Sequence, residues 1–220
     1  MPVLIAFGTI VAAYLLGSIP FGWIIVRIKT GKDVRKVESG RTGGTNAMRA
    51  AGKLAGLATA CLDGLKGAWG VWLADAVINT LLPGAIWLKV AAGLAAILGH
   101  NYSIFLAERT EQGKWRLRGG AGGGTAVGGA FGLWPPSLLI IFPIGGAMWY
   151  FIGYASVTTM SAALIVAIMF AIRAALGQGP WEYVFYGIGA EILLVWALRP
   201  NIKRLLEGKE RIVGWRVRKR

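Results

Sequence analysis

The sequence has 220 residues, of which 55% are hydrophobic and 15% charged, with a mean hydropathy of +0.58. This composition excludes an ordinary soluble domain and is typical of a polytopic membrane protein. A single cysteine, Cys61, excludes an internal disulfide framework, and a single histidine, His100, excludes a His-rich metal site. A site made only of carboxylates has little support, so we expect no metal and no cofactor.

The net charge of +14 is concentrated in three basic blocks. Residues 27–53, 107–118 and 199–220 hold 21 of the 24 lysines and arginines. A basic chain can bind nucleic acid, but these blocks flank apolar segments and lack interleaved aromatic platforms, so we expect no nucleic-acid partner. The positive-inside rule explains the pattern more simply and predicts that all three blocks face the cytoplasm.

Apolar segments separate the basic blocks. They span residues 3–26, 54–82, 84–106, 137–153, 156–176 and 181–198. The first segment carries no charge and is long enough to span a hydrocarbon core, which needs about 20 residues. It could instead be a signal peptide, but no basic region precedes it and Arg27 follows it directly. We therefore expect it to remain as the first membrane crossing.

A further membrane crossing is needed if the second and third basic blocks both face the cytoplasm. Only three of these segments separate the second block from the third, and an odd number would place the two blocks on opposite sides. Residues 122–136 are short and apolar and can supply the missing crossing if protein surrounds them. We predict an all-α polytopic membrane protein with seven transmembrane helices and short interfacial helices, the N-terminus outside and the C-terminus inside. The alternative has six crossings, with 122–136 re-entrant.

The C-terminal residues 201–220 are too polar to span a membrane. Hydrophobic residues stand between basic ones there, which predicts a helix lying on an anionic membrane surface. No internal repeat, linker or second domain can be recognised, so we expect one integral membrane domain over residues 1–220.

The first candidate site lies in residues 38–56, ESGRTGGTNAMRAAGKLAG. Thr45 or Asn46 is a good N-cap for a helix that continues through Ala51. Free N–H groups at such a helix start attract anions, and Arg49 can add a bidentate contact to a phosphate. The alternative is an ordinary capped helix with a solvated arginine.

A second candidate site repeats this design. A glycine-rich loop from Gly119 to Gly124 leads into Thr125 and a new apolar segment, and glycines let backbone N–H groups approach a phosphate closely. It is not a Walker A loop, because no Gly-Lys-Ser/Thr follows at the required spacing. Helix packing by small residues is the alternative. Two such loops on one predicted face favour two anionic groups bound side by side at the membrane surface.

A third feature is the pair Asp63 and Lys66, three residues apart inside an apolar segment. Charges inside a crossing are costly and usually face the bundle interior, so the pair is either structural or orients a substrate site. His100 ends the third crossing, where a lone histidine is more often structural than catalytic. A triad of Ser39, His100 and Asp63 can be imagined, but the sequence has no Gly-x-Ser-x-Gly nucleophile elbow.

Together these motifs resemble the bacterial acyl-phosphate:glycerol-3-phosphate acyltransferase family, nearly from end to end. The segment SGRTGGTNAMR resembles the family's Ser-Gly-Asn-x-Gly-Ala-Thr-Asn-x-x-Arg motif, and GGAGGGTA resembles its Gly-Gly-Lys-Gly-x-Ala-Thr loop. Further similar segments are GSIPFG at 17–22, DVRKVESG at 33–40, LDGLKG at 62–67, LGH at 98–100, YASVTT at 154–159 and NIKRLLEGKE at 201–210.

The resemblance implies an enzyme that transfers a fatty acyl group from an acyl-phosphate to the 1-hydroxyl of glycerol 3-phosphate. The products would be lysophosphatidic acid and phosphate, in the first acylation of phospholipid biosynthesis. It also implies a bacterial inner-membrane location, with membrane lipid as a partner and a cytoplasmic site. The catalytic residues expected on this basis are Ser39, Arg49 and Asn201. The substrate-binding residues expected are Thr45, Asn46, Asp63, Lys66, His100, Gly119, Gly120, Gly122, Thr125 and Ser156.

Several positions depart from the family pattern. The lysine of the glycine-rich loop is Ala121 here, and the histidine three positions before Asn201 is Leu198. Both changes remove groups that the resemblance assigns to the phosphate site. Arg41 replaces the family's asparagine after Ser-Gly, and with the arginines before the loop it could supply the missing charge.

The expected reaction needs no protein nucleophile, because an acyl-phosphate is already activated and phosphate is a good leaving group. Alignment of the reactants can contribute about 7–11 kcal/mol, and the departing phosphate can serve as the base. One alternative is another phosphorylated polyol as acceptor, and a second is a divergent paralogue that binds phosphate or lipid without catalysis. A third, an anion transporter, lacks an inverted repeat in the sequence. The oligomeric state stays open.

Overall fold

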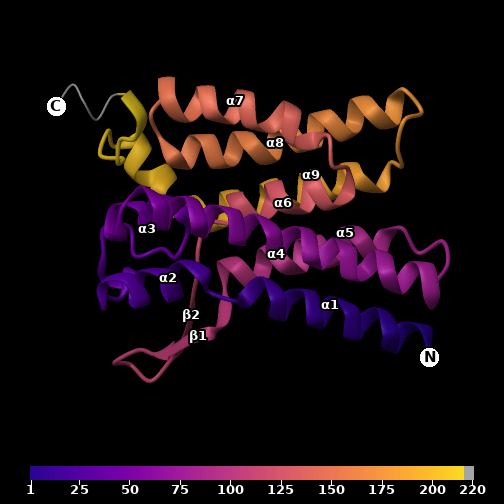
Figure 1. Cartoon of the computed structure of the whole chain (residues 1–220), viewed down its shortest axis with the longest axis horizontal. Coiled ribbons are helices and arrows are strands. Elements are labelled where there is room, and N and C mark those ends of the chain that lie inside the picture. The colour runs from indigo at the N-terminus through magenta and orange to yellow at the C-terminus, as the bar shows by residue number, and fades with distance from the viewer. Residues whose placement is uncertain (216–220) are drawn as a thin grey trace.

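A computed structural model describes residues 1–215 of the chain, and its longer helices run along the long axis of the molecule (Figure 1). The predicted all-α class is confirmed, apart from one short β-hairpin. The long-axis helices are α1 (Pro2–Ser18), α4 (Lys53–Thr80), α5 (Trp87–Asn101), α6 (Gly123–Leu133), α7 (Ser137–Phe151), α8 (Ala155–Ala175) and α9 (Glu182–Leu206).

The remaining elements gather at one end of the long axis, together with the C-terminal residues, while the N-terminus lies at the opposite end (Figure 1). These elements are α2 (Phe21–Thr30), the 3-10 helix η1 (Val34–Lys36), α3 (Gly44–Ala51) and the antiparallel strands β1 (Ser103–Arg109) and β2 (Trp115–Arg118). The described parts of all three basic blocks therefore lie at the same end of the molecule.

The first apolar segment is not one continuous helix. Helix α1 ends at Ser18 and α2 begins at Phe21, because Pro20 disfavours helical backbone at the preceding residue and cannot donate a backbone hydrogen bond. The carbonyl of Ile19, which the break leaves without a helical partner, accepts a hydrogen bond of 2.8 Å from Lys66 Nζ. A buried charge in α4 thereby stabilises the break.

Two segments of the described chain are long and apolar enough to cross a membrane by length and composition, Pro2–Thr30 and Ala155–Ala175. The other long-axis helices are shorter or contain charged residues. The count of seven crossings stays a prediction.

Glycines allow α6 to pack directly on α4. A Cβ atom on Gly67 would lie 2.1 Å from the carbonyl oxygen of Thr125, and one on Gly128 would lie 1.8 Å from that of Gly64. Close packing by small residues is how helices approach one another in membranes. Small residues therefore bring α6 and α4 together from Thr125 onward, beyond the loop Gly119–Gly124 for which packing was the alternative.

Two segments differ from the sequence-based expectation. The apolar segment 84–106 ends as strand β1, because the residues after α5 pair with β2 instead of continuing the helix. The surface helix expected over 201–220 is wrong for 207–215, because α9 ends at Leu206 and the chain turns back. Ile212 then forms a β-bridge with Tyr154, and the N–H of Val213 donates to the carbonyl of Gly153 at 2.8 Å. Residues 216–220 lie outside the described part of the chain.

Candidate functional site

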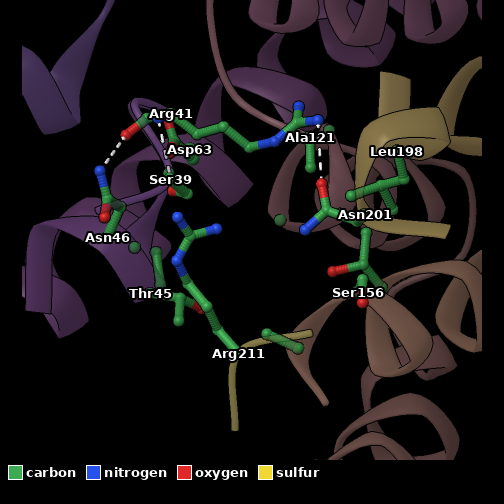
Figure 2. A pocket seen from close by; sticks show the side chains of 18 of the residues that line it. Ser39, Arg41, Thr45, Asn46, Asp63, Ala121, Ser156, Leu198, Asn201 and Arg211 are labelled. Atoms are coloured by element: carbon green, nitrogen blue, oxygen red, sulfur yellow. Dashed lines mark hydrogen bonds between the residues drawn. The ribbon is translucent and has the colours of Figure 1, made fainter. Parts of the chain in front are cut away.

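A pocket of about 220 Å³ lies at the end of the molecule where α2, α3 and the C-terminal residues gather (Figures 1 and 2). Its walls come from parts of the chain that are distant in sequence. They are α3 with the loop before it, the middle of α4, the end of α5, the glycine-rich loop with the start of α6, and the meeting point of α8, α9 and the C-terminal segment. Its polar side chains include those of Ser39, Arg41, Thr45, Asn46, Arg49, Asp63, His100, Ser156, Asn201, Glu210 and Arg211.

The start of α3 forms one wall of the pocket. The predicted cap at Thr45 or Asn46 is wrong, because the helix already begins at Gly44 and Gly43 is the N-cap, without a side-chain hydrogen bond. The N–H groups of Gly44 and Thr45 precede any acceptor within the helix, whereas that of Asn46 donates to the carbonyl of Gly43 at 3.1 Å. The side chain of Asn46 instead binds the preceding loop. Its amide nitrogen donates to the carbonyls of Val34 (3.1 Å), Val37 (3.0 Å) and Arg41 (2.8 Å).

The start of α6 forms a second wall of the same pocket. Its N-cap is Gly122, with φ of +89°, a conformation that favours glycine over residues with a Cβ atom. Gly123 and Gly124 of the first helical turn also line the pocket, whereas Thr125 is fully buried behind them. The fold thus brings together the two loops that the sequence indicated, and two helix N-termini face one pocket.

The first two glycines of the loop have a different role. A Cβ atom on Gly119 would lie 2.1 Å from the carbonyl oxygen of His100, and one on Gly120 would lie 1.9 Å from His100 Nε2. The N–H of Gly120 donates to the same carbonyl at 2.9 Å. These glycines allow the loop to pack on the end of α5, and neither of them lines the pocket.

A buried polar cluster lies beneath the pocket. Lys66 Nζ is 3.0 Å from Asp63 Oδ1, so the predicted ion pair is confirmed, and His100 Nδ1 is 3.5 Å from the same oxygen. Asp63 and His100 line the pocket, but Lys66 does not. The triad is not formed: Ser39 Oγ accepts the N–H of Arg41 at 3.4 Å, and within residues 1–215 it makes no hydrogen bond to His100.

The guanidinium group of Arg41 lies beside Ala121, as Figure 2 shows. It donates to the carbonyl of Gly120 at 3.1 Å, to Asn201 Oδ1 at 3.2 Å, and to the carbonyl of Ala197. Its burial lowers the pKa of Arg41 from its ordinary value, but an arginine remains charged. The positive charge of Arg41 therefore lies next to Ala121, where the glycine-rich loop has no charged side chain.

Two further arginines line the pocket. Arg49 is half-buried and, within the described chain, makes no hydrogen bond or salt bridge through its side chain. Its burial lowers the pKa of Arg49, and the nearby Glu38 opposes that change. Arg211 reaches into the pocket in Figure 2, and its Nε lies 3.1 Å from Glu38 Oε2. Arg49 is thus the arginine of the pocket for which no donor has a partner in the described chain, whereas Arg211 has only Nη1 left without one.

Glu210 ties the C-terminal segment to the site. This buried carboxylate accepts hydrogen bonds from Asn201 Nδ2 at 2.8 Å, Arg204 Nε at 3.0 Å and Ser156 Oγ at 3.4 Å. The sequence reasoning missed Glu210 and Arg211, because it assigned their segment to a surface helix. The available signal was that the last family-like motif, NIKRLLEGKE, ends at Glu210.

An apolar groove of about 540 Å³ adjoins the polar pocket. It lies between α4, α6, α7 and α8, and it shares Ala60, Gly123, Gly124 and Thr159 with the pocket wall. Hydrophobic side chains make up most of its remaining lining, among them Leu65, Val127, Phe131, Leu138, Ile141 and Phe142. A polar, arginine-lined pocket next to an apolar groove suits a ligand with an anionic head and a hydrocarbon tail.

Comparisons with known proteins agree with this chemistry. A family model described as glycerol-3-phosphate acyltransferase matches residues 7–208. A glycerol-3-phosphate acyltransferase of Thermus thermophilus is 38% identical over 215 residues, covering 98% of each chain. Glycerol-3-phosphate acyltransferase 3 of Dehalococcoides mccartyi is 35% identical over 219 residues, covering 95% of this chain and 96% of the relative.

Two solved structures share the fold. One is the crystal structure of PlsY (YgiH), an integral membrane glycerol 3-phosphate acyltransferase, in its glycerol 3-phosphate form. It has a TM-score of 0.76 and 34% identity, and the match covers 95% of this chain and 96% of that one. The lysophosphatidic acid form of PlsY has a TM-score of 0.74 and 32% identity, with 95% of each chain covered.

Proposed function

This chain belongs to the glycerol-3-phosphate acyltransferase family, and we propose that it transfers a fatty acyl group from an acyl-phosphate to the 1-hydroxyl of glycerol 3-phosphate. The products would be lysophosphatidic acid and inorganic phosphate, in the first acylation of phospholipid biosynthesis. One observation carries this proposal: two helix N-termini and three arginines line a pocket that opens onto an apolar groove.

The pocket supplies what two phosphate groups need. Each helix N-terminus presents backbone N–H groups and about half a positive charge to an anion. The starts of α3 and α6 can therefore each hold one phosphate, and Arg49 adds a planar fork of donors that suits phosphate oxygens. Glycerol 3-phosphate and an acyl-phosphate each carry one such group.

The groove accounts for the remaining part of the donor. Burying a hydrocarbon chain is favourable by about 0.8 kcal/mol for each CH₂ group, so a fatty acyl tail binds where apolar side chains line a groove. The groove meets the polar pocket at Ala60, Gly123, Gly124 and Thr159. An acyl-phosphate with its tail in the groove places its reactive carbonyl near the start of α6.

The chemistry requires no covalent enzyme intermediate. The acceptor hydroxyl attacks the acyl carbonyl, a new C–O ester bond forms, and the bond from the carbonyl carbon to the phosphate oxygen breaks. The hydroxyl proton passes to the departing phosphate, so atoms and charges balance without a protein base. Leu198 supplies no base, which fits this substrate-assisted route, and N–H groups at the start of α6 stabilise the developing oxyanion.

The catalytic residues then divide into two kinds. Arg49 contacts a substrate phosphate, and the Ser39 hydroxyl donates a hydrogen bond to substrate, since its only described partner is the N–H of Arg41. Asn201 is a positioning residue, because its amide nitrogen binds Glu210 and its amide oxygen holds the guanidinium of Arg41.

We further propose seven membrane crossings in a bacterial inner membrane, with the pocket facing the cytoplasm. The supporting observations are the seven long-axis helices, the clustering of the basic blocks at one end, and the fold shared with an integral membrane protein.

A divergent paralogue without catalysis is the second candidate, because Ala121 and Leu198 line the pocket where the resemblance places a lysine and a histidine. A comparison of acyl donors tests the first proposal against it. Purified protein is given radiolabelled glycerol 3-phosphate with either an acyl-phosphate or an acyl-CoA. We expect labelled lysophosphatidic acid from the acyl-phosphate alone, whereas no product from either donor supports the divergent paralogue.

A further inference from the structure

A second polar pocket, of about 300 Å³, borders the first along Ser39, Arg41 and Asn201. Its other walls are the end of α5, strand β2 with the first glycines of the loop, and the C-terminal part of α9. The residues that line only this second pocket include Asn101, Tyr102, Arg116, Arg118, Gly119, Gly120, Pro200 and Arg204. The proposed acyl transfer places no reactant in this second pocket.

The charge of this pocket is entirely positive. Four arginines line it, Arg41, Arg116, Arg118 and Arg204, and no acidic residue does. Arg118 forms a salt bridge with Glu108 at 2.5 Å, and Arg204 forms one with Glu210 at 3.0 Å. Neither of these glutamates lines the pocket. Within residues 1–215, neither Arg41 nor Arg116 has a carboxylate within salt-bridge distance. Two of the four positive charges therefore lack a direct counter-ion.

Arg41 and Arg204 carry like charges and both line this pocket. Burial lowers the pKa of Arg41 most, and the charge of Arg204 lowers it further. The donors of Arg41 meet only carbonyl and amide oxygens, which satisfy hydrogen bonds but do not neutralise charge. An anion bound between these arginines would relieve that repulsion.

We propose that this pocket binds a phosphate dianion, and that its ligand is the inorganic phosphate released by acyl transfer. Guanidinium forks match the oxygens of phosphate, and Arg41 borders both pockets, so a phosphate can pass from the reaction site to the second pocket along one side chain. The apolar groove shares no lining residue with the second pocket, which favours a free phosphate over a lipid headgroup. The source of the phosphate rests on the proposed function; the anion site itself does not.

Direct binding of inorganic [³²P]phosphate to the purified, detergent-solubilised protein tests the proposal. Equilibrium dialysis at fixed ionic strength is run with and without saturating glycerol 3-phosphate and a non-hydrolysable acyl-phosphonate, which together occupy both phosphate positions of the first pocket. We expect one phosphate to remain bound under saturation. Arg116→Ala should weaken that binding on the order of tenfold, since it removes one charged contact. Displacement of all phosphate by these two ligands would overturn the proposal.

Arg109→Ala is the matched control. Arg109 is on the same hairpin, stacks on Trp115 with its guanidinium carbon 5.2 Å from the ring centre, and does not line the pocket. The substitution Arg109→Ala removes the same charge as Arg116→Ala. Because Arg109 lies outside the pocket, phosphate binding should stay unchanged. Equal weakening by both substitutions would show that the effect is general electrostatics and would contradict a specific site.

A lipid arm separates the two sources of phosphate. The same binding is measured in nanodiscs of phosphatidylcholine and in nanodiscs that contain phosphatidylglycerol. Equal affinity supports a free phosphate, whereas competition by phosphatidylglycerol would assign the pocket to a lipid headgroup and refute the proposal. Acyl transfer is assayed on the same preparation, so phosphate binding without acyl transfer counts against the proposed function and not against the anion site.

Discussion

The side chain of Arg41 occupies the space beside Ala121 and joins three parts of the site, namely the loop before α3, the glycine-rich loop and α9. Its contacts with Gly120 and Asn201 fix the direction of the guanidinium fork. At the scale of single residues, this placement supports the interpretation that Arg41 provides the charge that Ala121 does not.

We predict that Arg41→Ala lowers kcat/KM about tenfold to a hundredfold, since a charged hydrogen bond to substrate is worth roughly 1.5–3 kcal/mol. Ala121→Lys in the otherwise unchanged protein should alter kcat/KM little, because the added charge is redundant. The variant with both substitutions should recover part of the loss. Phosphate release with acyl-phosphate and glycerol 3-phosphate measures all four proteins.

The opposite pattern has a different meaning. If wild-type turnover is undetectable and Ala121→Lys combined with Leu198→His creates activity, then Arg41 does not compensate. The chain would then be a divergent paralogue.

Arg49 gives a second prediction at this scale. It lines the pocket without a described partner, whereas Arg109 is stacked on Trp115 on the hairpin. Arg49→Ala should therefore reduce kcat/KM by about tenfold to a hundredfold, and Arg109→Ala should have little effect. Steady-state kinetics of the two variants test this prediction. Equal losses of kcat/KM would show that the substrate phosphate does not bind at Arg49.

At the scale of elements, the glycine-rich loop depends on how closely it packs against the end of α5. We predict that Gly120→Ala lowers both activity and melting temperature, because the added Cβ atom would lie 1.9 Å from His100 Nε2. Overpacking of this kind costs typically about 1–3 kcal/mol. Gly8→Ala is the control, since no atom lies within 4 Å of its Cβ position. Thermal melts in detergent compare the two, and equal stability would contradict the described packing.

The sequence predicted some elements well and others poorly, for physical reasons. Helices such as α4 and α8 follow from long apolar runs, which have few alternatives in a membrane. Strand β1 was missed because a short apolar run does not distinguish a strand from the end of a helix. Pairing with β2 makes this segment a strand. The C-terminal segment was misassigned because its fold depends on pairing with Tyr154, which is distant in sequence.

The site shows the same division. The two glycine-rich helix starts could be predicted because each depends on local backbone conformation. The N-cap of α3 could not be placed, since the amide of Asn46 is occupied by carbonyls of the preceding loop and Gly43 caps the helix instead. Glu210 and Arg211 join the pocket only through the long-range turn of the chain. The motif NIKRLLEGKE reaches Glu210 but does not show where the segment lies, and no local pattern marks Arg211.

At the scale of the whole molecule, the segments that carry the three basic blocks lie at one end of a helical bundle and the N-terminus lies at the other (Figure 1). We predict that this end faces the cytoplasm. In a Cys61→Ala background, Gln112→Cys on the exposed hairpin should escape a membrane-impermeant thiol reagent in intact cells and react after permeabilisation. Gln178→Cys, exposed between α8 and α9, is the matched control and should react in intact cells. Efficient labelling at 112 from outside would refute the topology.

The most direct test of the central claim is the stoichiometry of the reaction. Purified protein receives an acyl-phosphate and radiolabelled glycerol 3-phosphate, and released phosphate and labelled lysophosphatidic acid are counted together. Direct transfer within one pocket predicts one phosphate for each lysophosphatidic acid, and no phosphate release above background when glycerol 3-phosphate is left out. Phosphate release without the acceptor, or no lysophosphatidic acid at all, would contradict it.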